Sequence, residues 1–218
     1  MVKICGVRRL EDALTAADAG ADYVGMVFVP GRRRRIEPSD ARLIANGLRE
    51  STTTAPESVG LFGDQPLDEV LATIAVSGID YAQLCGDESI DYCREVQHRA
   101  GVIKVLHVPA DSGETTIHAL DCQIRAFADA GCTVTLDSEV VGLHGGTGQS
   151  FDWRVASALA EHRAFLLAGG LTPDNVAGAV ESVRPWGVDV SSGVETDGDK
   201  DADKIGRFVR NARASGQA

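Results

Sequence analysis

One pattern recurs along the whole chain: a short apolar run rich in β-branched residues, then a loop, then a segment with apolar residues at helical spacing. Runs that are apolar throughout are typical of parallel strands covered by helices. Parallel strands need long crossover connections, and a helical segment is available between successive runs. There are eight such runs, at Val2–Val7, Tyr23–Val29, Glu57–Gly63, Tyr81–Gly86, Val102–Val108, Thr133–Ser138, Ala164–Gly170 and Gly187–Gly193.

The intervening segments carry the spacing i, i+3, i+4, i+7 that places apolar residues on one helix face. It begins at Leu10, Ala41, Leu67, Val176 and Ile205, whereas segments 88–98 and 152–162 match it less well. Asp64 and Thr172 are expected to cap helix starts. Left-handed helix ends are expected at Gly20, Gly78, Gly101 and Gly131.

Eight β/α units in one chain predict an α/β fold, a single-domain (β/α)8 TIM barrel over residues 1–218. Residues 212–218 are expected to form a frayed tail. The alternative, a doubly wound sheet, needs fewer strands and usually a glycine fingerprint after the first. The first run instead ends in Cys5-Gly6-Val7-Arg8, and no GK[ST] phosphate loop occurs.

Composition narrows the functional classes. A net charge of −11 argues against non-specific nucleic-acid binding, and no apolar run is long enough for a membrane span. The first run starts at Val2, which leaves no room for a signal peptide. Five cysteines without a CxxC pair, and scattered histidines, favour reduced thiols in a cytoplasmic protein without a metal site. Only four of the 21 basic residues are lysines, and such an acidic, lysine-poor surface suggests a halophilic protein.

A barrel places active residues at the carboxyl ends of its strands, and the last two runs end in small residues. The seventh ends in Gly169 and Gly170, and the eighth in Ser191, Ser192 and Gly193. Loops at these two positions bind phosphate in many barrels, through backbone N–H groups that glycine lets approach the anion. A phosphorylated small-molecule substrate is therefore expected.

A thiol and a carboxyl group stand at two other strand ends. Lys3 and Cys5 share one face of the first run, so Cys5 should lie near the barrel mouth if that face looks inward. Asp137 ends the sixth run, where an acid is costly unless it is solvated or used. Two such groups on opposite sides of a substrate suit proton-transfer chemistry.

Four arginines, Arg32 to Arg35, follow the second run in an otherwise acidic chain. They are suited either to bind a substrate carboxylate or phosphate or to pair with nearby acids in a solvated loop. The glycine cluster His144-Gly145-Gly146-Thr147-Gly148 is interpreted as a flexible lid or a tight turn.

An ordered set of motifs along nearly the whole chain resembles the phosphoribosylanthranilate isomerase family of tryptophan biosynthesis. These motifs are Lys3-Ile4-Cys5-Gly6, Gly20-Ala21-Asp22, Arg34 with Ile36 and Pro38, Val59-Gly60-Leu61-Phe62, Gln83-Leu84, Leu136-Asp137-Ser138, Gly145-Gly146-Thr147-Gly148, Phe151-Asp152-Trp153, Leu167-Ala168-Gly169-Gly170-Leu171 and Asp189-Val190-Ser191-Ser192-Gly193-Val194-Glu195.

The resemblance implies an Amadori rearrangement of N-(5-phosphoribosyl)anthranilate without a cofactor or metal. It assigns catalysis to Cys5 and Asp137, and substrate binding to Arg34, Gln83 and the two small-residue loops. Two departures stand out. Cys85 replaces a usual histidine, and arginines flank Arg34 in place of more usual residues.

The sequence leaves other functions open. A related isomerase of the histidine pathway resembles this barrel but typically has an aspartate where Cys5 stands, which also disfavours a dual-substrate enzyme. A non-catalytic barrel that binds a phosphorylated metabolite would need neither Cys5 nor Asp137. The chain is expected to be a monomer or a homodimer.

Overall fold

The structure, a computed structural model, describes residues 1–109, 113–138 and 153–215. Eight parallel strands pair in chain order and close into a barrel, because β1 pairs with both β2 and β8. This confirms the (β/α)8 barrel, and the doubly wound alternative is wrong because an open sheet would leave β1 and β8 unpaired with each other. The strands are β1 Val2–Cys5, β2 Tyr23–Val27, β3 Glu57–Phe62, β4 Tyr81–Leu84, β5 Gly101–Val108, β6 Thr133–Ser138, β7 Leu166–Leu167 and β8 Gly187–Val190.

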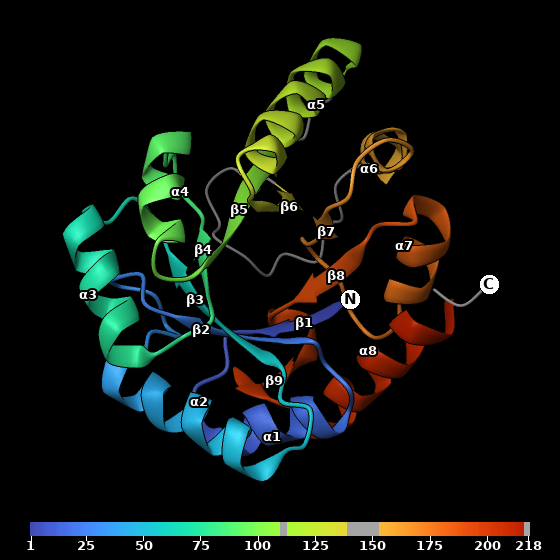
Figure 1. Cartoon of the computed structure of the whole chain (residues 1–218). Helices are drawn as coiled ribbons and strands as arrows, with labels where there is room; N and C mark the ends of the chain where they lie inside the picture. The colour runs from blue at the N-terminus through green and yellow to red at the C-terminus, as the bar shows by residue number, and fades with distance from the viewer. Residues whose placement is uncertain (110–112, 139–152, 216–218) are drawn as a thin grey trace.

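Helices surround the barrel (Figure 1), each with its apolar stripe against the strands. The segments with the weaker pattern also fold as helices, since α4 buries Cys93 and Val96 and the Ser89 hydroxyl caps its first turn. The helices are α1 Leu10–Asp18, α2 Pro38–Ser51, α3 Leu67–Ser77, α4 Ile90–Gln97, α5 Glu114–Asp129, α6 Trp153–Ala160, α7 Val176–Val183 and α8 Ala202–Ser215.

Two expectations about helix ends are wrong. Gly20, Gly78 and Gly131 have positive φ as expected, but Gly101 instead opens β5. Asp64 does not cap α3, because its carboxylate accepts the Asp87 N–H at 2.7 Å. At Asp64 the loop after β3 is thus tied to the loop after β4 rather than to its own helix.

The expected fraying from residue 212 is wrong for the described part of the tail. Helix α8 continues to Ser215, and Ala212 is buried in the core. Arg213 donates to the Gly20 carbonyl at 2.6 Å and to Asp22 at 3.0 Å. These contacts hold the last turns of α8 against the connection between α1 and β2.

A hairpin follows β8 that the sequence pattern did not predict. A short 3-10 turn, η1 (Ser192–Val194), leads into the antiparallel strands β9 (Glu195–Thr196) and β10 (Asp199–Lys200). Its two-residue turn, Asp197-Gly198, has positive φ at both positions, as such tight hairpins require. The hairpin brings Glu195 and Lys200 beside the end of β8.

The core has two parts, separated by the barrel wall. Tyr23, Val59, Ile103 and Leu166 form a small buried cluster inside the barrel. A much larger cluster fills the space between the strands and the helices. Because neighbours in register share a face, Lys3 points inward with its partner Tyr23, and Cys5, two residues on, does too. In the described residues, no helix is long and apolar enough to cross a membrane.

Candidate active site

The residues expected to form the site lie along one rim of the barrel, at the carboxyl ends of the strands. Cys5 ends β1, and Asp137 is the penultimate residue of β6. Gly169 and Gly170 follow β7, and Ser191 follows β8 directly. Barrel closure therefore brings together groups that are up to 186 positions apart in the chain.

Cys5 is a buried thiol above a buried ion pair. It is 6% exposed, and Lys3 beneath it is fully buried with Nζ 2.6 Å from Oδ2 of Asp189. Burial raises the pKa of the Cys5 thiol, while the charge of Lys3 and a hydrogen bond from it act in the opposite direction. Burial also acts to lower the pKa of Lys3, but Asp189 outweighs this and raises it, so the ammonium stays charged.

Arg34 reaches the rim from the loop between β2 and α2. This loop folds back along its own strand, since the Ile36 N–H donates to the Val27 carbonyl at 3.0 Å. The stem of Arg34 crosses Gly6 beside Ser191: a Cβ on Gly6 would lie 2.5 Å from Cδ of Arg34 and 3.0 Å from the Ser191 hydroxyl. Gly6, with φ of +78°, is thus the only kind of residue that fits there.

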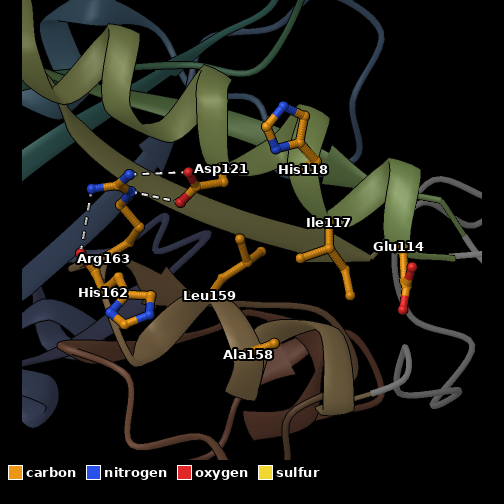
Figure 2. A pocket seen from close by; sticks show the side chains of 8 residues that line it. All are labelled: Glu114, Ile117, His118, Asp121, Ala158, Leu159, His162 and Arg163. Atoms are coloured by element: carbon orange, nitrogen blue, oxygen red, sulfur yellow. Dashed lines mark hydrogen bonds and ion pairs between the residues drawn. The ribbon is translucent and has the colours of Figure 1, made fainter.

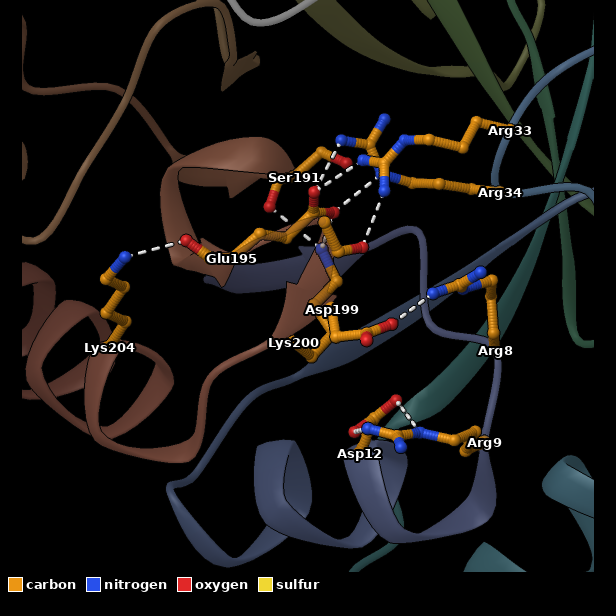
Figure 3. A network of polar contacts seen from close by, with 11 residues as sticks. Arg8, Arg9, Asp12, Arg33, Arg34, Ser191, Glu195, Asp199, Lys200 and Lys204 are labelled. Carbon is orange, nitrogen blue, oxygen red and sulfur yellow. Dashed lines mark hydrogen bonds and ion pairs between the residues drawn. The ribbon is translucent and has the colours of Figure 1, made fainter.

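Glu195 of the hairpin holds the Arg34 guanidinium in a two-point contact, drawn in Figure 3. Arg34 Nε donates to Oε1 at 2.6 Å, and Nη2 donates to Oε2 at 2.9 Å. Arg33 donates to the same carboxylate at 2.7 Å, and Lys200 does so at 3.0 Å. Burial acts to raise the pKa of Glu195, but these cations outweigh it and lower the pKa to about 2.

Arg33 and Arg35 differ in what they bind. Arg33 also donates to the Gly198 carbonyl at 2.6 Å, which ties the β2 loop to the hairpin turn. Arg35 pairs with the neighbouring Glu37 at 2.8 Å on the surface. All three arginines thus pair with acids, Arg33 and Arg34 with Glu195 at the rim and Arg35 with Glu37 on the surface, and binding of a substrate anion by Arg34 stays a prediction.

The loops after β7 and β8 pack backbone against backbone. Gly169 and Gly170 both have positive φ, at 90° and 66°. A Cβ on Gly193 would lie 1.9 Å from the Leu171 carbonyl oxygen, so only glycine allows this approach. Asn175 fixes the first loop, because its amide donates to the Gly170 carbonyl at 3.0 Å and accepts the Thr172 N–H at 2.8 Å. The two loops form one continuous backbone surface, the kind of surface that binds phosphate.

Strands β4 and β5 add Gln83, Cys85 and His107 to this side of the barrel. Gln83 is 5% exposed, and its amide donates to the Cys85 sulfur at 3.5 Å. Burial raises the pKa of the Cys85 thiol to about 12, so Cys85 is a thiol rather than a thiolate at neutral pH. His107 lies in register with Asp137 on the adjacent strand, and its Nε2 is 3.1 Å from the Cys85 carbonyl oxygen.

Several of these groups were missed in the sequence. Lys3 was placed on the same face as Cys5 but given no role, and Asp189 was recognised only within a motif, although a charged residue inside an apolar strand is itself a signal of pairing or use. Lys200 could not be found, because the hairpin that carries it has no hydrophobic period. The cluster His144–Gly148, with Phe151 and Asp152, lies outside the described residues.

The cavity in Figure 2 lies elsewhere, on the outer side of the barrel between α5 and α6. Its volume is about 560 Å³, and it is lined by His118, His162 and their neighbours. Arg163 and Asp121 pair beside it, with Nε 2.7 Å from Oδ1. None of the strand-end residues lines it, so the candidate site rests on the geometry of the rim. In the described residues, no three His, Cys, Asp or Glu side chains are placed to hold a metal ion.

Known proteins are similar to this chain in sequence and in architecture over nearly its whole length. A family model described as N-(5'phosphoribosyl)anthranilate (PRA) isomerase matches residues 2–211. The N-(5'-phosphoribosyl)anthranilate isomerase of Roseiflexus sp. (strain RS-1) is 45% identical, with 99% of each chain covered, and that of Desulforudis audaxviator is 44% identical, with 98% of each covered.

Solved structures agree. The crystal structure of phosphoribosyl anthranilate isomerase from Thermotoga maritima has a TM-score of 0.83, 37% identity and 98% of each chain covered. A phosphoribosyl anthranilate isomerase in complex with reduced 1-(o-carboxyphenylamino)-1-deoxyribulose 5-phosphate has a TM-score of 0.79, 35% identity and the same coverage. With this match over residues 2–211, the chain belongs to the N-(5'-phosphoribosyl)anthranilate isomerase family.

Proposed function

We propose that this chain is an isomerase of tryptophan biosynthesis that converts N-(5-phosphoribosyl)anthranilate to 1-(2-carboxyphenylamino)-1-deoxyribulose 5-phosphate. The observation that carries the proposal is the convergence on one rim of Cys5, Asp137, Arg34 and the paired glycine loops. A relative of the same fold has been solved with the reduced form of this product bound.

The proposed chemistry needs one acid and one base. Asp137, protonated, gives its proton to the ribose ring oxygen as the bond from that oxygen to C1 breaks, and the nitrogen lone pair forms an iminium at C1. The Cys5 thiolate then takes the proton from C2, and the electron pair of that C–H bond forms the C1–C2 double bond of an enolamine. Tautomerisation places a proton on C1 and a ketone at C2, so the product is an isomer of the substrate.

The remaining groups bind the two anionic ends of the substrate. Glu195 occupies the Nε and Nη2 edge of Arg34, and we assign the Nη1 side to the anthranilate carboxylate. Gly169, Gly170, Ser191, Ser192 and Gly193 would bind the phosphate, with Gln83 also in contact with the substrate. Fixing both ends positions C1 and C2 between the acid and the base.

The proposal is tested by turnover of freshly made phosphoribosylanthranilate, followed by its loss of fluorescence against a no-enzyme control. Cys5→Ala and Asp137→Asn should each lower kcat by about 10²–10⁴, the usual contribution of a positioned proton-transfer group. Both variants should still bind the phosphate group of the substrate with nearly unchanged affinity. Cys122→Ala, at an exposed cysteine on α5, is the matched control and should keep full activity.

Other outcomes separate the alternatives. Near-normal turnover in Cys5→Ala would contradict the role of that residue. Turnover only of the histidine-pathway aminoaldose, or of both substrates, would identify the related or the dual-substrate isomerase. Tight binding of the product with no turnover by folded protein would indicate the non-catalytic barrel.

We also propose a cytoplasmic location, on the reduced cysteines and the biosynthetic family, and adaptation to high salt, on the acidic, lysine-poor composition. The oligomeric state, monomer or homodimer, stays a prediction. One similar structure is described as monomers generated from the dimeric enzyme of Thermotoga maritima, and sedimentation of the purified chain distinguishes the two states.

A further inference from the structure

Lys3 is a fully buried cation in the barrel interior that the proposed chemistry leaves unexplained. Its side chain has no exposed surface, and its ammonium lies 2.6 Å from Oδ2 of Asp189. Burying an ion pair is often no better for stability than packing apolar residues in the same volume. A buried pair directly below a proposed base is therefore more than a packing feature.

The geometry places this cation under the thiol. Lys3 and Cys5 are two residues apart on β1, so their side chains follow each other on the inner face. Lys3 is in register with Asp189 on β8, and Cys5 is in register with Gly25 on β2. A Cβ on Gly25 would lie 3.0 Å from Sγ of Cys5, so glycine leaves the sulfur room at the seam between β1 and β2.

Asp189 binds the ammonium from one side only. Its Oδ2 accepts from Lys3, whereas its buried Oδ1 has no hydrogen-bond partner among the residues that the structure describes. A lysine ammonium has three donors. One is directed to Asp189, and because Lys3 and Cys5 share the inner face of β1, the charge of the ammonium acts to lower the pKa of the thiol against the larger effect of burial.

We propose that Lys3 is the counter-ion of the Cys5 thiolate, and that Asp189 is the positioning residue that holds the Lys3 ammonium beneath the sulfur. The inference rests on the proposed function in taking Cys5 as the base. Lys3 keeps its protons throughout. It stabilises the thiolate before the C2 proton moves to sulfur, and it is again in place when the thiol releases that proton.

Other groups near Cys5 also affect the pKa of its thiol. Lys200 approaches from the hairpin and favours the thiolate, whereas Asp189 favours the thiol. Arg34 lies on the loop after β2, Cys85 follows β4 and interacts electrostatically with Cys5, and Asp137 is on the rim at β6. Among the charges that act on Cys5, Lys3 has the largest effect, and so it is the one to remove.

The chain supplies a matched control in a second buried pair. Lys104 on β5 lies 2.8 Å from Glu88, and their side chains are 3% and 2% exposed. Lys104 faces the outer layer, where its ammonium is 5.9 Å from the centre of the Phe127 ring of α5. Lys104→Met thus removes an equally buried lysine that is not under the thiol.

The test is the rate of alkylation of Cys5 by iodoacetamide between pH 6 and pH 10, followed by mass spectrometry of the peptide that carries Cys5. In Lys3→Met the profile should move to higher pH, with a rate at pH 7 lower by about tenfold or more, the loss of thiolate for one pKa unit. Asp189→Asn should also move it to higher pH, because the buried ammonium loses the carboxylate that holds it beneath the sulfur and keeps it charged. Lys104→Met should leave it unchanged.

Shifts to higher pH in both Lys3→Met and Asp189→Asn, with none in the equally buried Lys104→Met, are not expected from a general loss of packing. A Lys3→Met profile that coincides with the wild-type profile, or with that of Lys104→Met, would overturn the inference. If Lys3→Met does not fold, the double variant Lys3→Met/Asp189→Leu replaces the whole pair with apolar residues. It should still shift the profile upward, since Lys3 acts on Cys5 more strongly than Asp189 does.

Turnover separates this inference from the proposed function. If the alkylation profile shifts but kcat does not, Lys3 is the counter-ion of a thiol that is not the base, and the assigned role of Cys5 fails alone. If kcat at neutral pH falls with the thiolate fraction while KM changes little, both proposals are supported. An unshifted profile overturns the counter-ion role whatever the turnover.

Discussion

Arg34 illustrates how a single side chain depends on a residue 161 positions away. Its guanidinium is fixed by two short hydrogen bonds to Glu195, a carboxylate that also receives Arg33 and Lys200. A lysine could make one of these contacts but not both, because it is a point charge on a flexible stem. In the proposed function, the planar fork therefore determines where the substrate carboxylate would bind.

Arg34→Lys should lower kcat/KM by about tenfold to a hundredfold, since a charge-assisted hydrogen bond contributes about 1.5–3 kcal/mol. Most of the loss should appear in KM if Arg34 only binds the carboxylate. Arg33→Lys is the control, because Arg33 is half exposed and contacts the outer side of the same acid. It should change kcat/KM by less than about threefold. Equal effects of the two substitutions in steady-state kinetics would contradict the assignment.

Glu195 should make stability fall steeply in acid. Its pKa is about 2 in the folded protein, below the usual 4.5, so its contribution is fully present above pH 4.5 and is lost as the pH falls toward 2. The shift corresponds to on the order of 3 kcal/mol at neutral pH. Glu195→Gln should be less stable at pH 7 and show a flatter profile from pH 5 to pH 2. Urea unfolding across this range measures both effects.

At the level of residues, the sequence was informative wherever a strand end could be located. Cys5, Asp137, Gly169 and Ser191 all lie at the rim, because alternation and glycine content mark strand ends. Glu195 and Asp189 were recognised only as members of a motif, and no role was predicted for either. Their partners, Arg34 and Lys3, come from the other end of the chain, and no local pattern encodes such pairs.

Among the elements, the loops after β7 and β8 act as one unit because their backbones touch. Gly193→Ala would place a methyl group 1.9 Å from the Leu171 carbonyl oxygen, and backbone must move to relieve this contact. The two loops should separate, and KM and the inhibition constant for inorganic phosphate should both rise about tenfold or more. Cys5 alkylation should remain at its wild-type rate. Unchanged phosphate inhibition in the variant would show that the loops do not bind the anion.

Gly178, in the helical layer, differs from Gly193 because a Cβ fits there without a clash. It lies inside α7, and among the described residues a Cβ there would meet only the Trp153 ring, at 4.0 Å. Gly178→Ala should therefore raise the free energy of unfolding by about 0.5–1 kcal/mol, because alanine loses less backbone entropy in a helix. Urea denaturation should show a higher midpoint with an unchanged slope, and activity should match wild type. A lower midpoint would mean that α7 cannot accept the methyl group.

The order of the elements followed from hydrophobic period alone, but their lengths did not. The run Ala164–Gly170 forms only the two-residue strand β7, because a strand ends where its ladder ends and not where its apolar residues end. The β9–β10 hairpin was missed because both of its strands are two residues long and polar. Short polar strands have no alternation to detect.

For the whole molecule, the charge balance predicts a response to salt. The 32 acidic residues exceed the 21 basic ones, so self-repulsion should outweigh the surface ion pairs at low ionic strength. Raising KCl from 0.05 M to 1 M shortens the screening length to about 3 Å, and the Tm should rise by several degrees. Sucrose, which stabilises without screening charge, is the control. A Tm that does not change or falls with KCl would contradict adaptation to high salt.

The pairing of β1 with β8 also determines when, during synthesis, the residues of the proposed site can come together. The thiol of Cys5 leaves the ribosome well before Asp189, Glu195 and Lys200, which lie more than 180 residues later in the chain. Until then Lys3 has no carboxylate beside it, and Arg34 has nothing to hold its guanidinium. A nascent chain that lacks the final strand therefore carries the proposed base but no assembled site, so chemistry at Cys5 begins only when the barrel is finished.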